Sequence, residues 1–276
     1  MSAAPWHYTK GDLVGALGMC GVGLGDVVFV HVSLGRLGYP DRGPNVESAS
    51  AVLAEALLES VGAGGTLLVP TYSYSIGRGE PFDPATTPGT IGPFSEWFRQ
   101  HVAVVRSADP MLSVVGVGRQ AEALLSDLPR TCYGEGSLYH RLDEIGAKLC
   151  LVGLGLHYAT YRHYIEELAR VPFRFRKAFT GIVTVDGAAR QEDWLYYAAP
   201  FLDNCQPDGV PLAALAEKAG LVRVAPVGRG EIRVIGCREY RTLALAQLAQ
   251  NPWFTAQGPP VSRAEMMVGE TEVADH

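Results

Sequence analysis

The sequence predicts an α/β fold: a central, mostly parallel sheet flanked by helices, with an additional antiparallel β-hairpin portion in the C-terminal third. A β-branched run at 27–32 and an apolar run at 66–71 are each preceded by turn residues, which is typical of buried strands. Between them Leu53, Leu57 and Val61 recur four positions apart, as on one face of a helix. Late in the chain, glycine turns separate segments in which apolar residues alternate, which indicates hairpins.

The first half of the chain alternates helices and strands. A helix begins after Thr9, and it is followed by the strand at 27–32 and a loop at 33–38. Asn45 or Ser48 then caps the helix that leads to the strand at 66–71. Strand, helix and strand in this order form a βαβ unit, so the two strands should be parallel with a right-handed crossover.

The segment at 72–92 is a long loop rich in Tyr, Gly, Pro and Thr. A functional loop and a self-packed Ω-loop both fit this composition. Pro93 suits the first turn of the next helix, which carries Phe94, Trp97 and Phe98 on one face. Further strands are expected at 113–117 and 148–153, and further helices at 120–125 and 160–169.

The pattern changes after residue 178. Asp186-Gly187 and Arg229-Gly230 each predict a hairpin turn. No Pro/Ser linker separates this part from the rest. We therefore expect a single composite domain over 1–276, with an α/β part at 1–177 and a β-hairpin and helix part at 178–276.

Composition excludes several classes of protein. The 276 residues carry 23 Lys+Arg against 29 Asp+Glu, a net charge of −6 without a clustered basic face, which argues against a nucleic-acid partner. No uninterrupted apolar stretch predicts a membrane helix or a signal peptide, so we expect a cytoplasmic protein. The 5 cysteines form no Cys-x-x-Cys pair and are expected to be free and buried.

The strongest chemical signal lies in the helix expected at 160–169. His163 and Glu166 are three residues apart and so lie on one helix face. A carboxylate on one imidazole nitrogen orients the ring and leaves the other nitrogen as a general base. An ordinary ion pair on the helix surface has the same spacing, so spacing alone leaves both interpretations open.

Six segments, taken in order, carry a family resemblance over about two thirds of the chain. They are Val30-His31-Val32-Ser33-Leu34 with Gly38; Gly65-Thr66-Leu67-Leu68-Val69-Pro70-Thr71; Phe82-Asp83-Pro84-Ala85-Thr86-Thr87-Pro88; Arg106-Ser107-Ala108-Asp109-Pro110 with Ser113; Gly134-Glu135-Gly136-Ser137 with Arg141-Leu142; and Thr160-Tyr161-Arg162-His163-Tyr164-Ile165-Glu166 with Val171-Pro172-Phe173-Arg174. Together they resemble the aminoglycoside 3-N-acetyltransferase family, the antibiotic acetyltransferases outside the GNAT superfamily.

The resemblance implies transfer of an acetyl or similar acyl group from acetyl-CoA to the amine of an amino sugar, aminocyclitol or related small metabolite. It implies that His163 is the general base and that Glu166 orients it. Thr160 and Ser33 are candidate hydroxyls for the tetrahedral oxyanion. The residues expected on the side of the co-substrate are His31, Ser33, Leu34, Gly35, Arg36, Gly38, Arg106 and Ser107. Those expected to face the acceptor are Asp83, Asp109, Glu135, His157 and Glu167.

Two departures from the family pattern widen the range of functions. Asp109 precedes the motif proline where the resistance enzymes usually carry His or Asn, and no acidic insertion is recognisable as a block. This pattern resembles the branch associated with biosynthetic gene clusters and surface polysaccharides. The alternative is therefore a non-standard acyl transfer or an intramolecular cyclisation in natural-product biosynthesis. A binding protein that lost transferase activity is a third interpretation, and a homodimer is left open.

Asp109 also raises a zinc hypothesis. His31, Asp109, Cys132 and His163 all lie beside matched segments and offer nitrogen, oxygen and sulfur ligands. No local ligand spacing supports it, so none of these residues is assigned as a metal ligand.

Overall fold

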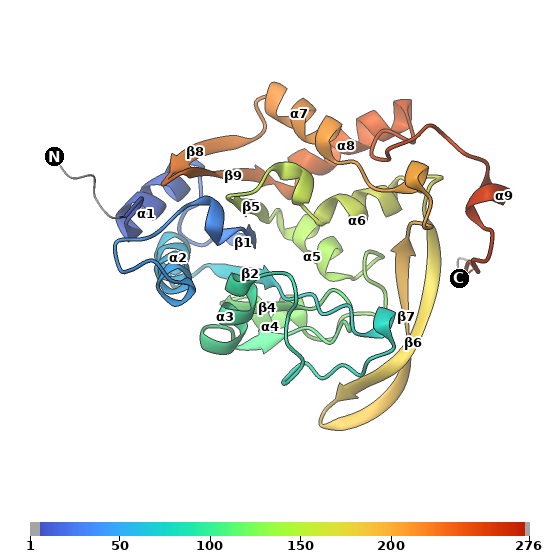
Figure 1. Cartoon of the computed structure of the whole chain (residues 1–276), viewed down its shortest axis with the longest axis horizontal. Helices are drawn as coiled ribbons and strands as arrows, with labels where there is room; N and C mark the ends of the chain where they lie inside the picture. Colours follow the sequence, from blue (N-terminus) through green and yellow to red (C-terminus); the bar gives the residue numbers. More distant parts are fainter. Residues whose placement is uncertain (1–5, 274–276) are drawn as a thin grey trace.

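The computed structural model describes residues 6–273, which form a seven-stranded sheet with helices on both faces and a separate two-stranded hairpin (Figure 1). The strand order in the large sheet is β3-β4-β2-β1-β5-β9-β8. The bounds of these strands are β1 (Val27–Val32), β2 (Thr66–Pro70), β3 (Val105–Arg106), β4 (Val114–Gly118), β5 (Lys148–Val152), β8 (Arg223–Val227) and β9 (Gly230–Gly236).

The centre of the sheet is parallel and its flanks are antiparallel. β1 pairs with β2 and β5 in parallel, whereas β4 and β9 run antiparallel to β2 and β5. The outer strands β3 and β8 reverse again, so only β4 and β9 oppose the common direction. The predicted α/β class with a mostly parallel sheet is confirmed, and β1-α2-β2 is the expected βαβ unit.

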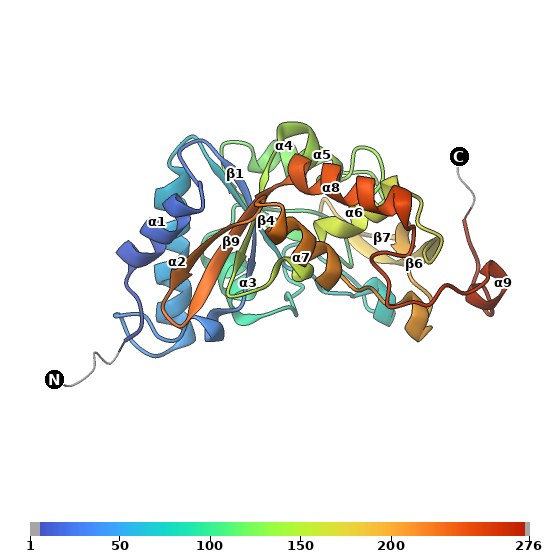
Figure 2. The same cartoon turned by 90° about the horizontal axis from the view of Figure 1, so that it is seen from above.

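Helices cover the sheet on both faces (Figure 2). The first face carries α1 (Lys10–Met19), α2 (Val46–Val61) and α3 (Pro93–His101). The second carries α4 (Ala121–Leu125), α5 (Leu138–Ile145), α6 (Tyr161–Leu168), α7 (Val210–Lys218), α8 (Cys237–Gln250) and, at its margin, α9 (Arg263–Met266). Side chains of β1 alternate between the two apolar layers, with Val28 and Val30 in the first and Phe29 in the second. His31 therefore points to the side of α6.

Local sequence explains where the early helices begin. Thr9 and Asp12 form a capping box at α1, and the side chain of Asn45 accepts the Ser48 N–H at α2. Pro93 occupies the first turn of α3 as expected. Helices α5 and α9 and the two-residue strand β3 were not predicted, and helices were expected within 178–276 without the bounds of α7 and α8.

The hairpin predicted at Asp186-Gly187 joins β6 (Phe175–Val185) to β7 (Ala188–Ala198). Its two turn residues have φ angles of 50° and 75°, as a two-residue hairpin turn with the right-handed twist requires. The long ribbon lies along one side of the molecule in Figure 1. The second predicted hairpin also forms, as β8 and β9. It extends the central sheet, however, because β9 pairs with β5.

The long loop between β2 and α3 makes backbone hydrogen bonds both to the hairpin strand β6 and to the residues just after β2. Phe82 exchanges backbone hydrogen bonds with Ile182 and Thr184 of β6, and the Thr90 N–H donates to the carbonyl of Tyr72. The loop therefore links the sheet to the hairpin.

Short 3₁₀ turns lie at η1 (Leu34–Arg36), η2 (Ile76–Arg78), η3 (Leu156–Tyr158) and η4 (Asp203–Cys205).

All five cysteines are free and buried, which confirms that prediction. Within residues 6–273 no helix has the length and apolar character needed to span a membrane.

Candidate active site

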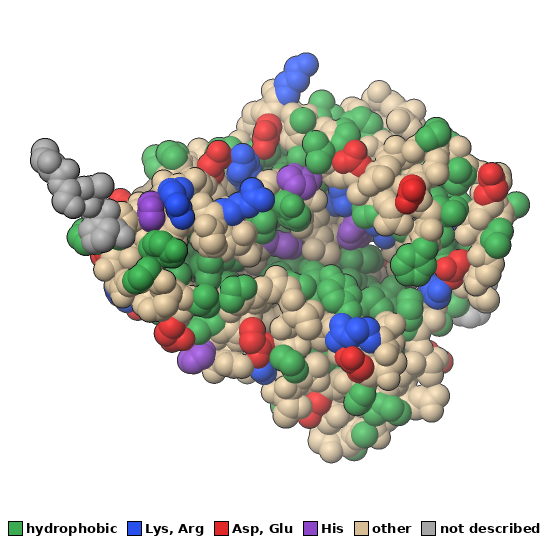
Figure 3. All heavy atoms as spheres, viewed as in Figure 1, with side chains coloured by type: hydrophobic (Ala, Val, Ile, Leu, Met, Phe, Trp, Pro, Cys, Tyr) green, Lys and Arg blue, Asp and Glu red, His purple; other side chains and the backbone are tan. Residues whose placement is uncertain are grey.

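Two loops that follow parallel strands touch each other at one edge of the sheet. The Ser33 N–H after β1 donates to the carbonyl of Val152 at the end of β5, at 2.9 Å. Gly153 has a φ of +67°, and a Cβ at this position would lie 2.7 Å from the Ser33 carbonyl oxygen, so a glycine is required there. This contact brings β1 next to the segment that leads into α6. In Figure 3 the face above this region is hollowed, and histidine side chains gather along the hollow.

His163 and Glu166 meet on α6 as the spacing predicts. The Nδ1 atom of His163 lies 2.7 Å from Oε2 of Glu166. The glutamate side chain is fully buried, whereas the histidine side chain is 19% exposed. A buried carboxylate behind a partly exposed imidazole excludes the interpretation as a solvated surface ion pair.

Glu166 is shared by two buried arginines. Arg174 Nε lies 2.8 Å from Oε2, and Arg162 Nε lies 3.3 Å from Oε1. Burial alone would raise the pKa of Glu166, but the charges of Arg174, His163 and Arg162 outweigh it and hold this pKa far below its ordinary value. The carboxylate is therefore ionised at neutral and mildly acidic pH.

The imidazole of His163 is uncharged at neutral pH. Burial, together with the positive charge of Arg174, lowers its pKa to about 4 against the opposite effect of Glu166. The ring of Tyr133 packs edge-on against it at 5.9 Å. An uncharged ring with a carboxylate on one nitrogen has the form that a general base needs.

Thr160, just before α6, connects His163's helix to β1. Its hydroxyl lies 3.2 Å from Nε2 of His31, and it contributes to the pKa of the neighbouring buried Tyr72 by lowering it against the larger effect of burial. The hydroxyl of Tyr72 bonds that of Tyr139 at 2.8 Å. Burial lowers the pKa of His31 to about 4, so this ring is also uncharged at neutral pH. Its Nδ1 is buried and has no hydrogen-bond partner among the described residues.

The zinc hypothesis is not supported by this arrangement. Asp109 accepts hydrogen bonds from the Met111 and Leu112 N–H groups, each at 2.8 Å, and from the Tyr196 hydroxyl at 2.7 Å. Across residues 6–273 no group of three or more His, Cys, Asp and Glu side chains is arranged to hold a metal ion. Asp109 is instead a buried anchor of its own turn, since Oδ1 of its carboxylate accepts all three of these bonds.

The residues predicted for the co-substrate separate into two groups. Ser33, Leu34, Gly35, Arg36 and Gly38 do lie in the loop after β1, with Gly35 and Arg36 exposed. Arg106 is held by protein acceptors: its guanidinium donates to the carbonyls of Pro84, Thr87 and Thr71. Ser107 is buried, and its hydroxyl accepts the Val114 N–H. These contacts argue for structural roles of Arg106 and Ser107 and against direct contact with the co-substrate.

The residues predicted to face the acceptor are dispersed. Glu135 and Glu167 line one pocket of about 340 Å³ beside α6, although Glu167 also pairs with Arg176 at 3.0 Å. Asp83 accepts the Ala85 N–H in a turn, and His157 packs against Tyr158 in η3. The structure thus brings together His163, Glu166, Thr160 and His31, and it does not gather the acidic residues into one cluster.

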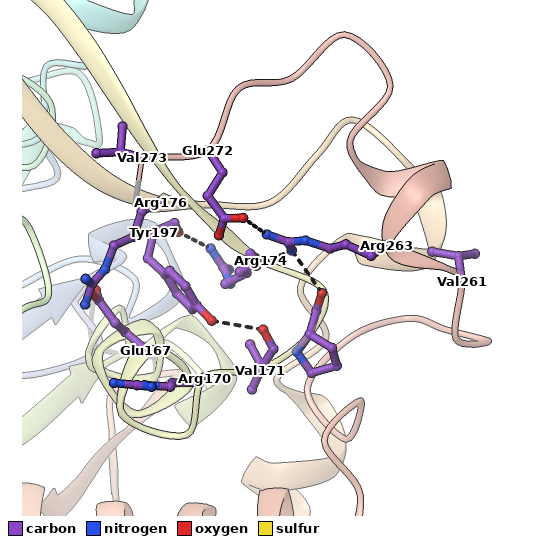
Figure 4. A pocket seen from close by; sticks show the side chains of 11 residues that line it. Glu167, Arg170, Val171, Arg174, Arg176, Tyr197, Val261, Arg263, Glu272 and Val273 are labelled. Carbon is purple, nitrogen blue, oxygen red and sulfur yellow. Dashed lines mark hydrogen bonds and ion pairs between the residues drawn. The ribbon is translucent and has the colours of Figure 1, made fainter. Parts of the chain in front are cut away.

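A larger pocket of about 610 Å³ lies on the other side of Arg174, between α6, the hairpin and the C-terminal segment (Figure 4). Arg263 bonds Glu272 and the carbonyls of Pro172 and Arg174 there, and the Tyr197 hydroxyl donates to the Val171 carbonyl. Glu167, Arg170, Arg174 and Arg176 also line it. His163 is not among the residues that line this pocket.

The sequence predicted no role for Arg174, Arg162 or Tyr133, although both arginines lie in the segments that carry the family resemblance. The only available signal was that two arginines flank the His163–Glu166 pair in sequence. Nothing in the sequence indicates that both are buried, with exposures of 5% for Arg162 and 7% for Arg174.

Comparison with known proteins gives consistent matches. The profile of the aminoglycoside 3-N-acetyltransferase family matches residues 29–249. Aminoglycoside N(3)-acetyltransferase IV of Salmonella sp is 32% identical over 257 residues, covering 92% of each chain. The crystal structure of the apoenzyme of aminoglycoside acetyltransferase AAC(3)-IVa has a TM-score of 0.73 at 30% identity and covers 92% of this chain and 93% of its own. A mutant of AAC(3)-IVa in complex with a gentamicin has a TM-score of 0.76 at 30% identity, with 94% and 95% covered.

Proposed function

The chain belongs to the aminoglycoside 3-N-acetyltransferase family, and we propose that it transfers an acetyl group from acetyl-CoA to an amine of an aminoglycoside or a related amino sugar or aminocyclitol. The predicted class of enzyme, an N-acetyltransferase, is confirmed by the family. The observation that carries the proposed mechanism is the partly exposed His163 imidazole held by the buried Glu166 carboxylate at 2.7 Å.

His163 acts as the general base. An acceptor amine must lose a proton before or as its nitrogen attacks the thioester carbonyl carbon. The uncharged imidazole takes that proton on the nitrogen that does not face Glu166, and the carboxylate stabilises the imidazolium. The new C–N bond forms as the C–S bond breaks, and the thiol leaves with a proton returned by His163.

His31 and Thr160 suit the thioester side of the reaction. The buried Nδ1 of His31 has no partner among the described residues, and the neighbouring Thr160 hydroxyl lies 3.2 Å from Nε2 of the same ring. A buried polar atom without a partner is costly unless a ligand satisfies it. We therefore expect acetyl-CoA, which supplies the activated acyl group, on the side of His31 and Thr160 and along the loop at 33–38.

The relatives support the acceptor class. Aminoglycoside N(3)-acetyltransferase IV is named for aminoglycosides, and AAC(3)-IVa was crystallised with a gentamicin. The net charge of −6 suits a cationic acceptor. The biosynthetic alternative stays a prediction, because Asp109 is bound by its own turn and gives no separate evidence for it.

The test is an assay of thiol release with acetyl-CoA and a panel of amines: gentamicin, a 2-deoxystreptamine-type aminocyclitol, a mono-amino sugar and a simple alkylamine. The proposal expects thiol release with at least one amino sugar or aminocyclitol and a matching acetylated product by mass spectrometry. The fully N-acetylated form of each acceptor is the control. No release above this control with any amine would contradict the proposed function.

A further inference from the structure

Arg174 contacts both members of the His163–Glu166 pair. It lies between α6 and β6 and is 7% exposed. Its Nε lies 2.8 Å from Oε2 of Glu166, the oxygen that also faces His163. Its Nη2 lies 2.8 Å from Nδ1 of His163. A third nitrogen, Nη1, donates to the carbonyl of Tyr197 at 2.8 Å and so fixes the plane of the guanidinium.

Arg174 and Glu166 both approach Nδ1 of His163, and they have opposite effects on the protonation of the ring. A guanidinium nitrogen can only donate, so in the tautomer that leaves Nε2 free, with the proton on Nδ1, Arg174 acts on the ring through its charge and not as a hydrogen-bond donor to Nδ1. Glu166 can only accept, so it favours a proton on the same nitrogen. In an isolated pair, the carboxylate would stabilise the imidazolium and make the histidine more basic. Here Arg174 pairs with Oε2 of Glu166, which offsets the negative charge that faces His163, and it adds a positive charge beside the ring.

We propose that Arg174 is a positioning residue: by sharing the Glu166 carboxylate with His163, its guanidinium keeps the imidazole uncharged and fixes its orientation. This inference rests on the proposed function insofar as His163 is the base. It concerns, however, the protonation of the ring, which is measurable without turnover.

The remaining groups around His163 act in the same direction. Arg162, on α6, places its Nε 3.3 Å from Oε1 of Glu166, so the carboxylate is held by positive charge on both oxygens. Tyr133, from the loop before α5, presents its ring at 5.9 Å, and burial keeps its hydroxyl protonated by raising its pKa. Two arginines thus oppose one glutamate, and a third positive charge on His163 is unfavourable.

A functional consequence follows for the pH range of the enzyme. A histidine paired only with a carboxylate becomes charged near neutral pH and then cannot accept a proton. With Arg174 in place the ring remains a free base well below neutral pH. The acid limb of the pH profile of kcat/KM should therefore lie below the ordinary histidine pKa of about 6.5.

The experiment is an NMR titration of the full chain labelled with ¹⁵N-histidine, in which the His163 signal is assigned by its absence in His163→Gln. In the wild type we expect His163 to titrate well below about 6.5. Arg174→Met, which keeps the side-chain bulk without the charge, should raise this pKa by about one pH unit or more. Arg174→Lys keeps the positive charge but lacks the planar guanidinium with its several donors, so it should raise the pKa of His163 less. The acid limb of kcat/KM should move by the same amounts.

Arg176→Lys is the matched control, because Arg176 pairs with the neighbouring carboxylate of Glu167. It should leave the titration of His163 unchanged. A wild-type His163 that titrates at or above about 6.5 would overturn the inference, and this result needs no variant to fold. Arg174→Met with an unchanged His163 pKa would overturn it as well. Absence of acetyl transfer in the wild type with the expected titration would overturn the proposed function and leave the role of Arg174 intact.

Discussion

The Nδ1 atom of His163 lies 2.7 Å from Oε2 of Glu166, and the glutamate is fully buried beneath it. The same carboxylate is held by Arg162 and Arg174, so a single residue joins the proposed base to the interior of the protein. Catalysis and stability should therefore respond together when Glu166 is changed.

Glu166→Gln should be strongly destabilising. It leaves two buried guanidinium groups without a counter-charge, and breaking a buried ion pair costs about 3–5 kcal/mol. The melting temperature should fall clearly, and acetyl transfer should fall at least tenfold because His163 loses its orienting partner. Glu167→Gln is the control, since its partner Arg176 is 34% exposed and can be solvated. Equal melting temperatures for Glu166→Gln and the wild type would be incompatible with a shared buried carboxylate.

Thr160→Val removes the hydroxyl and keeps the shape of the side chain, so it tests the role of the hydroxyl alone. The substitution removes a partner from the buried imidazole of His31, which costs roughly 1–3 kcal/mol. We expect a lower free energy of unfolding in urea and a lower kcat. Thr160→Ser, which retains the hydroxyl, should recover most of both. If the valine and serine variants behave alike, the hydroxyl has no role.

The stability of the protein should fall as the pH is lowered below about 6.5. Burial lowers the pKa of His31 to about 4, and burial with Arg174 does the same for His163. Between a pH of about 4 and the ordinary histidine pKa of about 6.5, the unfolded chain binds more protons than the folded chain. The stabilising contribution of these two histidines is therefore complete above about pH 6.5 and is lost as the pH falls toward about 4. The depressed pKa of Glu166 has its effect only below the ordinary glutamate range. Calorimetric melting temperatures from about pH 7 to 4.5 check this. His31→Gln should flatten the dependence, and an unaltered slope would contradict the assignment to His31.

Replacement of Arg36 should mainly weaken the binding of acetyl-CoA, whereas replacement of Arg106 should mainly lower the stability of the fold. Arg36 is exposed in the loop expected to lie along the co-substrate, so Arg36→Ala should raise the KM for acetyl-CoA about fivefold, or roughly 1 kcal/mol. Arg106→Ala should mainly destabilise, by on the order of 2 kcal/mol, because its guanidinium on β3 bonds both the loop at 72–92 and the carbonyl of Thr71, the residue after β2. A strong KM effect for Arg106 with an unchanged melting temperature would restore its predicted place in the binding site.

Much of the fold follows from local patterns in the sequence. The apolar runs predicted β1, β2 and β5, and Asp186-Gly187 predicted the turn of the separate hairpin. The position of β9 beside β5 could not be predicted, because strand pairing across some 80 residues depends on the complete sheet and not on local composition. Helix α8 was missed although its buried residues, Cys237, Tyr240, Ala244 and Leu248, recur three to four positions apart as on one helix face.

The site was predictable where it depends on spacing along one helix. His163 and Glu166 come together because residues three apart share a helix face. The contact of His31 with Thr160 joins residues 129 positions apart, and no pattern in the sequence indicates it. The role of Asp109 could not be predicted, since burial and the Tyr196 hydroxyl decide it. Arg174 illustrates the same limit, because an arginine is ordinarily solvated and its burial is a property of the packed structure.

The central claim is tested most directly by comparing kcat and KM of the wild type and His163→Gln with acetyl-CoA and an accepted amine at neutral pH. The account predicts a fall in kcat of about 100-fold or more, because a general base typically contributes this factor, with the KM for acetyl-CoA little changed. His140→Gln, on α5, is the control for histidine loss and should retain wild-type kcat. A His163→Gln enzyme with unchanged kcat would contradict the account and remove His163 from the mechanism.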